Sequence, residues 1–357
     1  MDEISLLNRV RADVPERDPD DVIRGRAALL RAIDAPSAPT PARHPRRPWI
    51  LVGSAVAATC ALTGVFVFGG ALGAPVGADP AAAAVLGSAA TAARSVVDPV
   101  VGPGQYLEIR TDAVYAASGT TEADAEVVRR ERDGNIEEGD LTSFLQSNVQ
   151  ALWVPFDRAD DWIEVRCAGV PVQTFGPRSE TLVTEWEAAG TDGRSVFPGG
   201  ETEYGAPITM FDADSAADLP RDPRQLLERI YQENGDAGPS RDGEALVWIA
   251  DRLRAGTVPA DLRSVFYETA ALIPGVTITE EQATLNGRTG TAIGRDEDKN
   301  GFRQDIIIDP ETGAFIGERQ VLLRPGADMP AGTAIGSTSV TTSVVDAAPE
   351  GTALCAE

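Results

Sequence analysis

The most pronounced hydrophobic segment of the chain is an uncharged run that extends from Pro48 to Ala78. Its central part, residues 49–72, predicts a transmembrane helix, because helical residues rise ~1.5 Å each and a segment of this length spans roughly 36 Å. Three alternatives are a buried helix of a soluble domain, a signal peptide cleaved after Val76-Gly77-Ala78, and a lipidation site at Cys60. The long polar segment before the run argues against a signal peptide, whose charged n-region is short.

The residues that flank this run predict its orientation. Arg43, Arg46 and Arg47 come directly before it, and Asp79 follows it. Loops rich in arginine and lysine stay on the cytoplasmic side, so we expect a cytoplasmic N-terminus and an extracytoplasmic C-terminal part. Trp49 is suited to anchor the helix at the membrane–water interface. The predicted location is therefore the cell membrane, crossed once.

Residues 1–34 have the pattern of two short amphipathic helices, the second of which starts at Asp18-Pro19-Asp20-Asp21 with an N-cap and a proline at its first position. Residues 35–48 form a linker rich in proline and arginine, which predicts a stiff extended chain. Two helices this short cannot bury a core by themselves. The segment is therefore either a weakly structured tail or a docking element for a cytoplasmic regulator.

After the membrane segment, the pattern alternates between helical and strand periodicity. Asp79-Pro80 predicts the start of a helix over Ala81–Val97, which has a stripe of Leu86, Ala90 and Ala93. Strand-forming residues then predict strands at residues 105–116, 149–155 and 162–167. Apolar residues at helical spacing predict a helical block at residues 224–232, 243–254 and 261–273. Residues 168–222 are rich in glycine, proline, threonine and acids and give no clear assignment.

The clearest local pattern is an antiparallel meander of strands at residues 276–285, 288–294, 302–308 and 314–323. Asn286-Gly287 predicts a tight hairpin turn, because both residues tolerate positive φ. Asp309 to Gly313, with the sequence DPETG, predicts a second turn with proline and glycine at suitable positions. A last strand is expected at residues 337–345. We therefore predict an α+β fold for residues 79–357, with a curved antiparallel sheet and a helical block.

The amino-acid composition excludes several classes of function. The chain of 357 residues has a net charge of −24, one histidine and three cysteines. Residues 1–47 contain nine arginines and eight acidic residues, whereas residues 79–357 contain 22 basic and 47 acidic residues. The negative charge therefore belongs to the expected outer domain, which argues against nucleic-acid binding and against binding polyanions by charge alone. The single His44 nearly excludes a histidine-dependent triad, a zinc site or a haem site, and no cofactor motif is visible.

Cys167 and Cys355 are the two cysteines on the expected oxidising side, so a disulfide within the chain would join them. The alternative is two free thiols. Such a bridge would pin the C-terminal tail to an early strand and stabilise the fold by about 4–5 kcal/mol at most.

Three further patterns have a functional and a structural interpretation. Asp296 to Gly301, with the sequence DEDKNG, matches the first half of a calcium loop, but its twelfth position is Ile307, so a solvated hairpin loop is the simpler interpretation. Two acidic clusters could imitate the paired carboxylates of a glycosidase, although acids are abundant here; they are Asp157, Asp160 and Asp161, and Asp212, Asp214 and Asp218. The tryptophans could line a ligand cavity or fill the core; they are Trp153, Trp162, Trp186 and Trp248.

The chain resembles a family of actinobacterial single-pass membrane proteins, largely uncharacterised, with an anti-sigma-factor-like layout of short cytoplasmic helices, one membrane helix and an outer domain. The resemblance rests on the order of several segments: Met1–Ile33, LWVPFDRADDW at 152–162, LPRDPRQLL at 219–227, IPGV at 273–276, NGRTG at 286–290 and DPETG at 309–313. It implies no catalytic residues. The order of elements also looks like the half-barrel of periplasmic lipoprotein carriers and of sensor domains of sigma-factor regulators, which hold an acyl chain or a lipidated peptide.

These observations predict a non-enzymatic, membrane-anchored sensor or binding protein without a cofactor or metal. Its outer domain would bind an envelope lipid or protein, and residues 1–34 would regulate a cytoplasmic partner such as a sigma factor. The alternative is a tethered carrier-like module that binds a lipid or lipoprotein.

Overall fold

A computed structural model of the protein describes residues 77–356 except for 133, 187–190, 205, 209–210, 212–215 and 236–237. The chain divides into two units, Met1–Phe68 and Gly69–Glu357, and all described residues belong to the second. The expected helix pair 1–34, linker 35–48 and membrane helix 49–72, with Arg43, Arg46, Arg47 and Trp49, lie outside them. Among the residues that are described, no helix combines the length and the apolar character needed to cross a membrane.

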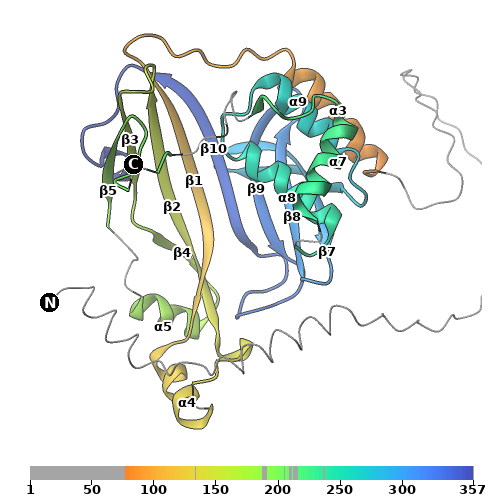
Figure 1. The fold of residues 1–357 in the computed structure, drawn as a ribbon. Coiled ribbons are helices and arrows are strands. Elements are labelled where there is room, and N and C mark those ends of the chain that lie inside the picture. The colour runs from red at the N-terminus through yellow and green to blue at the C-terminus, as the bar shows by residue number, and fades with distance from the viewer. Residues whose placement is uncertain are drawn as a thin grey trace, which may run out of the picture. The chain divides into compact units, whose positions relative to one another are not determined.

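The framework of the domain is a curved, ten-stranded antiparallel sheet in the described part of the chain (Figure 1). Along the sheet the strands follow the order β5-β3-β2-β1-β10-β9-β8-β7-β6, and β4 pairs with β2. The bounds are β1 Tyr106–Gly119, β2 Thr142–Pro155, β3 Asp161–Arg166, β4 Val170–Thr174, β5 Gly193–Pro198, β6 Thr277–Leu285, β7 Arg288–Glu297, β8 Phe302–Asp309, β9 Ala314–Leu322 and β10 Ala334–Val345. The last strand, β10, therefore joins the early strands to the meander.

The predicted meander is confirmed. Strands β6 to β9 pair in sequence order, and each pair is antiparallel. At the β6–β7 turn, Asn286 and Gly287 have φ of 47° and 72°, the positive values that a tight two-residue hairpin requires. At the β8–β9 turn, the Asp309 carboxylate accepts hydrogen bonds from the N–H groups of Glu311 and Thr312, and Gly313 has a φ of 70°.

Four helices pack on one face of the sheet (Figure 1). They are α3 Pro80–Ala93, α7 Pro223–Asn234, α8 Arg241–Leu253 and α9 Ala260–Ala270. Their apolar stripes form one core with the inward side chains of both halves of the sheet, including Ile109 of β1 and Ile306 of β8. The predicted stripe of α3 is confirmed, because Leu86, Ala90 and Ala93 are fully buried.

The helix starts follow the sequence signals more closely than the helix ends do. The Asp79 and Asp222 side chains cap α3 and α7, each followed by a proline at the first helical position. The α3 helix ends at Ala93 and not at Val97 as predicted, since Pro99 disfavours helical backbone at Asp98 and the preceding valines are stiff. In the same way α9 ends at Ala270, short of the predicted Ile273, which precedes Pro274.

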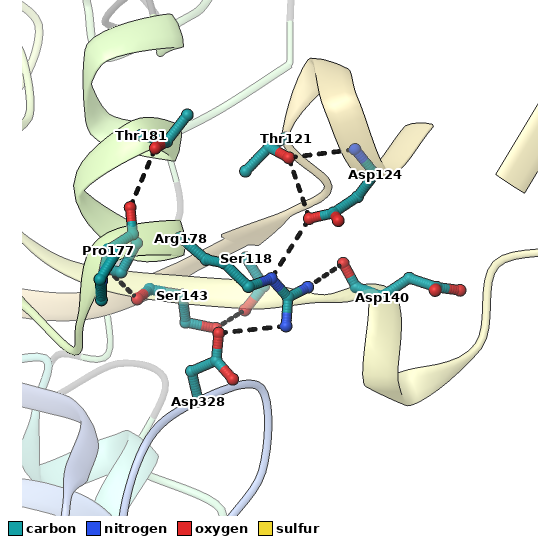
Figure 2. A network of polar contacts seen from close by, with 10 residues as sticks. Ser118, Thr121, Asp124, Asp140, Ser143, Pro177, Arg178, Thr181 and Asp328 are labelled. Atoms are coloured by element: carbon teal, nitrogen blue, oxygen red, sulfur yellow. Dashed lines mark hydrogen bonds and ion pairs between the residues drawn. The ribbon is translucent and has the colours of Figure 1, made fainter. Parts of the chain in front are cut away.

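Several elements lie where no assignment was made: α4 Glu122–Arg132, α5 Pro177–Glu185, the first half of β2, β4, β5, and the short 3-10 helices Glu138–Asp140 and Ala353–Ala356. Figure 2 shows how Arg178 of α5 holds this end of the domain together. Its guanidinium donates to the Asp124 carboxylate at 3.2 Å and to the carbonyl of Asp140 at 2.8 Å. It also pairs with Asp328 at 3.3 Å, so one side chain links α4, α5 and the β9–β10 connection.

The C-terminal tail covers the other face of the early strands. Leu354 packs on a small second cluster that contains Trp153, Ile163 and Val165. A disulfide between Cys167 and Cys355, whose Cα atoms are 5.3 Å apart, fastens the tail there. The tail therefore completes a core that strands β2 and β3 cannot close alone.

Candidate functional site

The strongest candidate for a ligand site is a partly open pocket of about 720 Å³ between the helical block and the sheet. It lies where the α3–β1 loop (residues 94–105) and the α8–α9 loop (residues 254–259) meet strands β1, β9 and β10. Its apolar lining includes Val96, Leu107, Leu253, Val258, Phe315 and Val340. The volume falls in the range of small-molecule sites, which are concave and mostly apolar.

The α8–α9 loop forms one wall of this larger pocket and fixes its position on the sheet. The loop crosses strands β10 and β1 at Gly256, whose φ is 75°. A Cβ at this position would lie 2.8 Å from Val340 Cγ2, so only glycine allows this close approach without movement. The Thr342 hydroxyl donates a 2.9 Å hydrogen bond to the Gly256 carbonyl and holds the loop in place.

Three arginines supply the positive charge of the larger pocket: Arg158 from the β2–β3 turn, Arg263 from α9 and Arg288 from the start of β7. Arg158 lies over the ring of Trp162, at 5.8 Å from its centroid. Arg263 donates to the Val258 carbonyl at 3.1 Å, and its buried Nε has no hydrogen-bond partner. These guanidiniums favour a negatively charged group in an otherwise apolar space.

Among the described residues, Asp98 is the one carboxylate in the lining of the larger pocket. It accepts a 2.8 Å hydrogen bond from the N–H of Ala260, at the N-terminus of α9, and lies 3.6 Å from the Arg263 guanidinium. Negative charge is stabilised at a helix N-terminus, because the N–H groups there have no partner within the helix. Asp98 thereby fastens the α3–β1 loop to the helical block.

The charges of the pocket arginines affect the pKa of two titratable groups next to the larger pocket. Burial raises the pKa of Tyr267, while Arg263 and Arg288 oppose that shift, and the Tyr267 hydroxyl donates to the Gly313 carbonyl at 3.2 Å. Burial acts to raise the pKa of Asp309, but hydrogen bonds from Thr312 and Glu311 and the charge of Arg288 lower it below its usual value. The positive potential of Arg288 thus acts on neighbouring groups, as it would on a bound anion.

A smaller pocket of about 440 Å³ lies on the other side of the α8–α9 loop. Ala255 lines this pocket and Gly256 lines the larger one, so the loop separates them. Its lining is more polar and includes Glu164, Asp251 and Arg254, and Arg254 pairs with Asp251 and Glu318 at 2.8 Å each. The charge of Arg254 is therefore already matched by two carboxylates.

The structure places the other candidate residues from the sequence away from the larger pocket. The DEDKNG segment comprises the last two residues of β7 and the β7–β8 turn, where Arg324 donates to the backbone carbonyls of Asp298 and Lys299. Glu297 is buried and accepts from Ser240, which caps α8. Within the described residues, no group of three or more metal-ligating side chains is arranged to hold an ion.

The acidic clusters do not converge on the larger pocket either. Asp157, Asp160 and Asp161 lie at the β2–β3 turn, where the Asp157 carboxylate accepts from the N–H of Ala159 and shapes the turn. Asp212 and Asp214 lie outside the described residues, and Asp218 precedes α7.

The four tryptophans take packing positions. Trp162 and Trp248 belong to the main core and Trp153 to the second cluster. Trp186 packs edge-to-face on Phe144. The Trp248 indole N–H donates to Glu233 at 3.2 Å, and Arg252 lies 3.3 Å from its ring centroid. Trp162 is nevertheless linked to the larger pocket through Arg158.

Sequence reasoning missed Asp98, Arg158, Arg263 and Arg288. Each sits in a different element, and no spacing in the sequence signals that they meet. The chain matches no protein-family profile, and no curated protein sequence matches it.

Proposed function

We propose that this protein is a membrane-anchored, extracytoplasmic, non-enzymatic binding protein whose folded domain holds an amphipathic anion, such as a lipid, in the larger pocket. The observation that supports this is the combination of apolar walls with the guanidiniums of Arg158, Arg263 and Arg288. Apolar walls gain free energy from each hydrocarbon group that leaves water, at ~25 cal/mol per Å². The arginines then select the ligands that have a negative head group.

The net charge of the domain strengthens this argument. A domain with 22 basic and 47 acidic residues repels anions over most of its surface. Three arginines at one apolar opening, with one carboxylate among them, are therefore a local exception that is suited to an anionic group. The order of elements, similar to that of half-barrel lipid carriers, supports the same ligand class by analogy of fold.

The regulatory part of the proposal rests on the sequence of the N-terminal segment. We propose that residues 1–34 dock on a cytoplasmic regulator, such as a sigma factor, and that ligand occupancy outside alters that contact. The alternative is a tethered carrier, in which the membrane helix only anchors the binding domain. The larger pocket fits both, so the cytoplasmic partner decides between them.

The test is purification of the full-length protein from its host in mild detergent, followed by mass spectrometry of bound lipids and proteins. We expect an anionic lipid in near-stoichiometric amount, and a several-fold loss of it in Arg288→Gln. Arg288 pairs through its backbone with Leu285, but its side chain makes no hydrogen bond or ion pair within the described part of the chain, so we expect this substitution to leave the packing intact. Arg166→Gln is the matched control, because Arg166 is an exposed arginine, paired with Glu164, that does not line the larger pocket.

Two outcomes would decide the proposal. Equal lipid content in Arg288→Gln, Arg166→Gln and the wild-type protein, or no lipid in any of them, would contradict the binding function. A cytoplasmic protein that is lost when residues 2–33 are deleted would support the sensor, and lipid without such a protein would favour the carrier.

A further inference from the structure

The α3–β1 loop exposes an apolar surface at the edge of the larger pocket. Residues 95–104 have the sequence SVVDPVVGPG. Val97 is 86% exposed and Val100 is 82% exposed, the highest values among the valines of the described residues. The loop arches from the end of α3 to the start of β1, at the top of the molecule in Figure 1.

The charged groups of this loop are paired with α9, although the side chains of Asp98 and Arg94 remain 44% and 50% exposed. Asp98, the one acid between α3 and β1, binds the N-terminus of α9 and faces Arg263. Arg94, at the C-cap of α3, is paired with Glu268 of α9. Apart from Asp98 and Ser95, the outward surface of residues 95–104 consists of valine, proline and glycine. Apolar tips of this kind, on an otherwise strongly charged domain, are typical of interaction sites.

The loop is continuous with the pocket. Val96 and Pro99 line the pocket, while Val97 and Val100 between and beside them point to solvent. Arg158, Arg263 and Arg288 line the same pocket and give it positive charge next to the apolar tip. An apolar tip beside basic groups is complementary to a bilayer, which presents hydrocarbon beneath phosphate head groups.

We propose that the α3–β1 loop contacts the surface of the lipid bilayer and forms the passage by which a ligand moves between the membrane and the larger pocket. The chain permits this contact, because only residues 73–79 separate the expected membrane helix from α3, a distance of ~25 Å at most when extended. Two valines give a weak, reversible contact, which suits transfer better than permanent insertion. The passage rests on the proposed binding function, whereas the membrane contact stands without it.

The first experiment measures the contact directly in the full-length protein in lipid nanodiscs. Single cysteines replace Val97, Val100 or Val172 in a Cys60→Ala background and carry an environment-sensitive fluorophore. Val172 of β4 is 54% exposed and is the matched control. With spin-labelled lipids, we expect at least twofold quenching at residues 97 and 100 and none at 172. Quenching at 97 and 100 no greater than at 172 would overturn the proposal.

The second experiment separates passage from binding. The double variant Val97→Asp/Val100→Asp is expected to slow the transfer of a fluorescent fatty acid between vesicles and the protein at least fivefold. Its equilibrium affinity for a water-soluble, short-chain fatty acid should stay within twofold of the wild-type value. An unchanged transfer rate would contradict the passage. Absence of fatty-acid binding in the wild-type protein would instead overturn the proposed function and leave the quenching result as the test of membrane contact.

Discussion

At the scale of single residues, Glu318 is the clearest case of a buried charge that the fold tolerates at a cost. Its side chain is 9% exposed on β9, between Arg254 and Gln304, whose side-chain nitrogens donate to its two carboxylate oxygens at 2.8 and 3.0 Å. Burial raises the pKa of Glu318 and outweighs the opposing effect of Arg254. The carboxylate is therefore less stable here than in water, although both of its oxygens have partners.

This shift predicts a pH dependence with a definite sign. Above the usual glutamate pKa of 4.5, the unfolded chain loses the Glu318 proton while the folded protein keeps it. The contribution of Glu318 to the free energy of unfolding is therefore full below that pH and falls as pH rises through the raised pKa, by at most ~1.4 kcal/mol per pH unit. We expect the free energy of unfolding of Glu318→Gln, measured by urea titration at several pH values, to lack this pH-dependent contribution. Glu350→Gln, at an exposed residue, is the control. If the free energy of unfolding of the wild type minus that of Glu318→Gln rose with pH, the argument would be contradicted.

At the scale of elements, the α8–α9 loop depends on one glycine. Gly256 combines a left-handed backbone with a close approach to Val340, whereas Gly332 has a φ of 88° and nothing within 4 Å of its Cβ position. We expect Gly332→Ala to cost about 1 kcal/mol from backbone strain alone. Gly256→Ala should cost about 2–4 kcal/mol, because the added methyl group also displaces the loop from the sheet. Equal losses of the free energy of unfolding in the two variants, measured by chemical denaturation, would show that the close approach of Gly256 to Val340 adds nothing to the backbone strain.

The C-terminal tail is a second element with a predictable energetic role. Reduction of the Cys167–Cys355 disulfide should lower the free energy of unfolding by about 2–5 kcal/mol and release the tail from the cluster around Trp153. Hydrogen exchange should then increase at residues 346–356 and in β3. A Cys60→Ala background ensures that no other thiol changes. Unchanged exchange and stability after reduction would show that packing of Leu354 alone holds the tail.

The elements that the sequence predicted are those with local determinants. Asp79-Pro80 caps α3, Asn286-Gly287 closes a hairpin, and the apolar spacing of α7, α8 and α9 specifies their buried stripes. The missed elements lack such signals. Seven of the eleven residues of α4 are charged, and β4 and β5 are exposed strands without alternation between buried and exposed residues.

The candidate site could not be predicted in the same way. Arg158, Arg263 and Arg288 meet only because β10 lies between β1 and β9 and brings the early strands next to the meander. Nothing in the local sequence of each arginine distinguishes it from the other arginines of the chain. The sequence of the α3–β1 loop does show four valines, but the pairing of Asp98 depends on α9, far along the chain.

At the scale of the whole molecule, the last strand decides whether the domain folds as one unit. Tyr106 of β1 pairs with Val345 of β10, so the early half of the sheet lacks its central neighbour until the chain is almost complete. Residues of β1 and β3 share one core with residues of β7 and β8 across this junction, for example Ile109 and Trp162 with Ile293 and Ile306. Pairing across so long a separation is slow, because the entropy of loop closure comes before the contacts form.

We therefore predict that deletion of residues 334–357 abolishes cooperative folding of both halves of the sheet. Deletion of residues 347–357 together with Cys167→Ala is the matched control, because it removes the tail and the disulfide but keeps β10. Proteolysis of the wild-type chain and both deletion variants at increasing urea concentration would give one transition for the control, at lower urea than the wild type. The longer deletion should be cleaved without urea at sites in both halves. A protease-resistant fragment that contains α7 to β9 would show that the meander and its helices fold alone. In that case the larger pocket would lie between two separately folding parts and not within one cooperative domain.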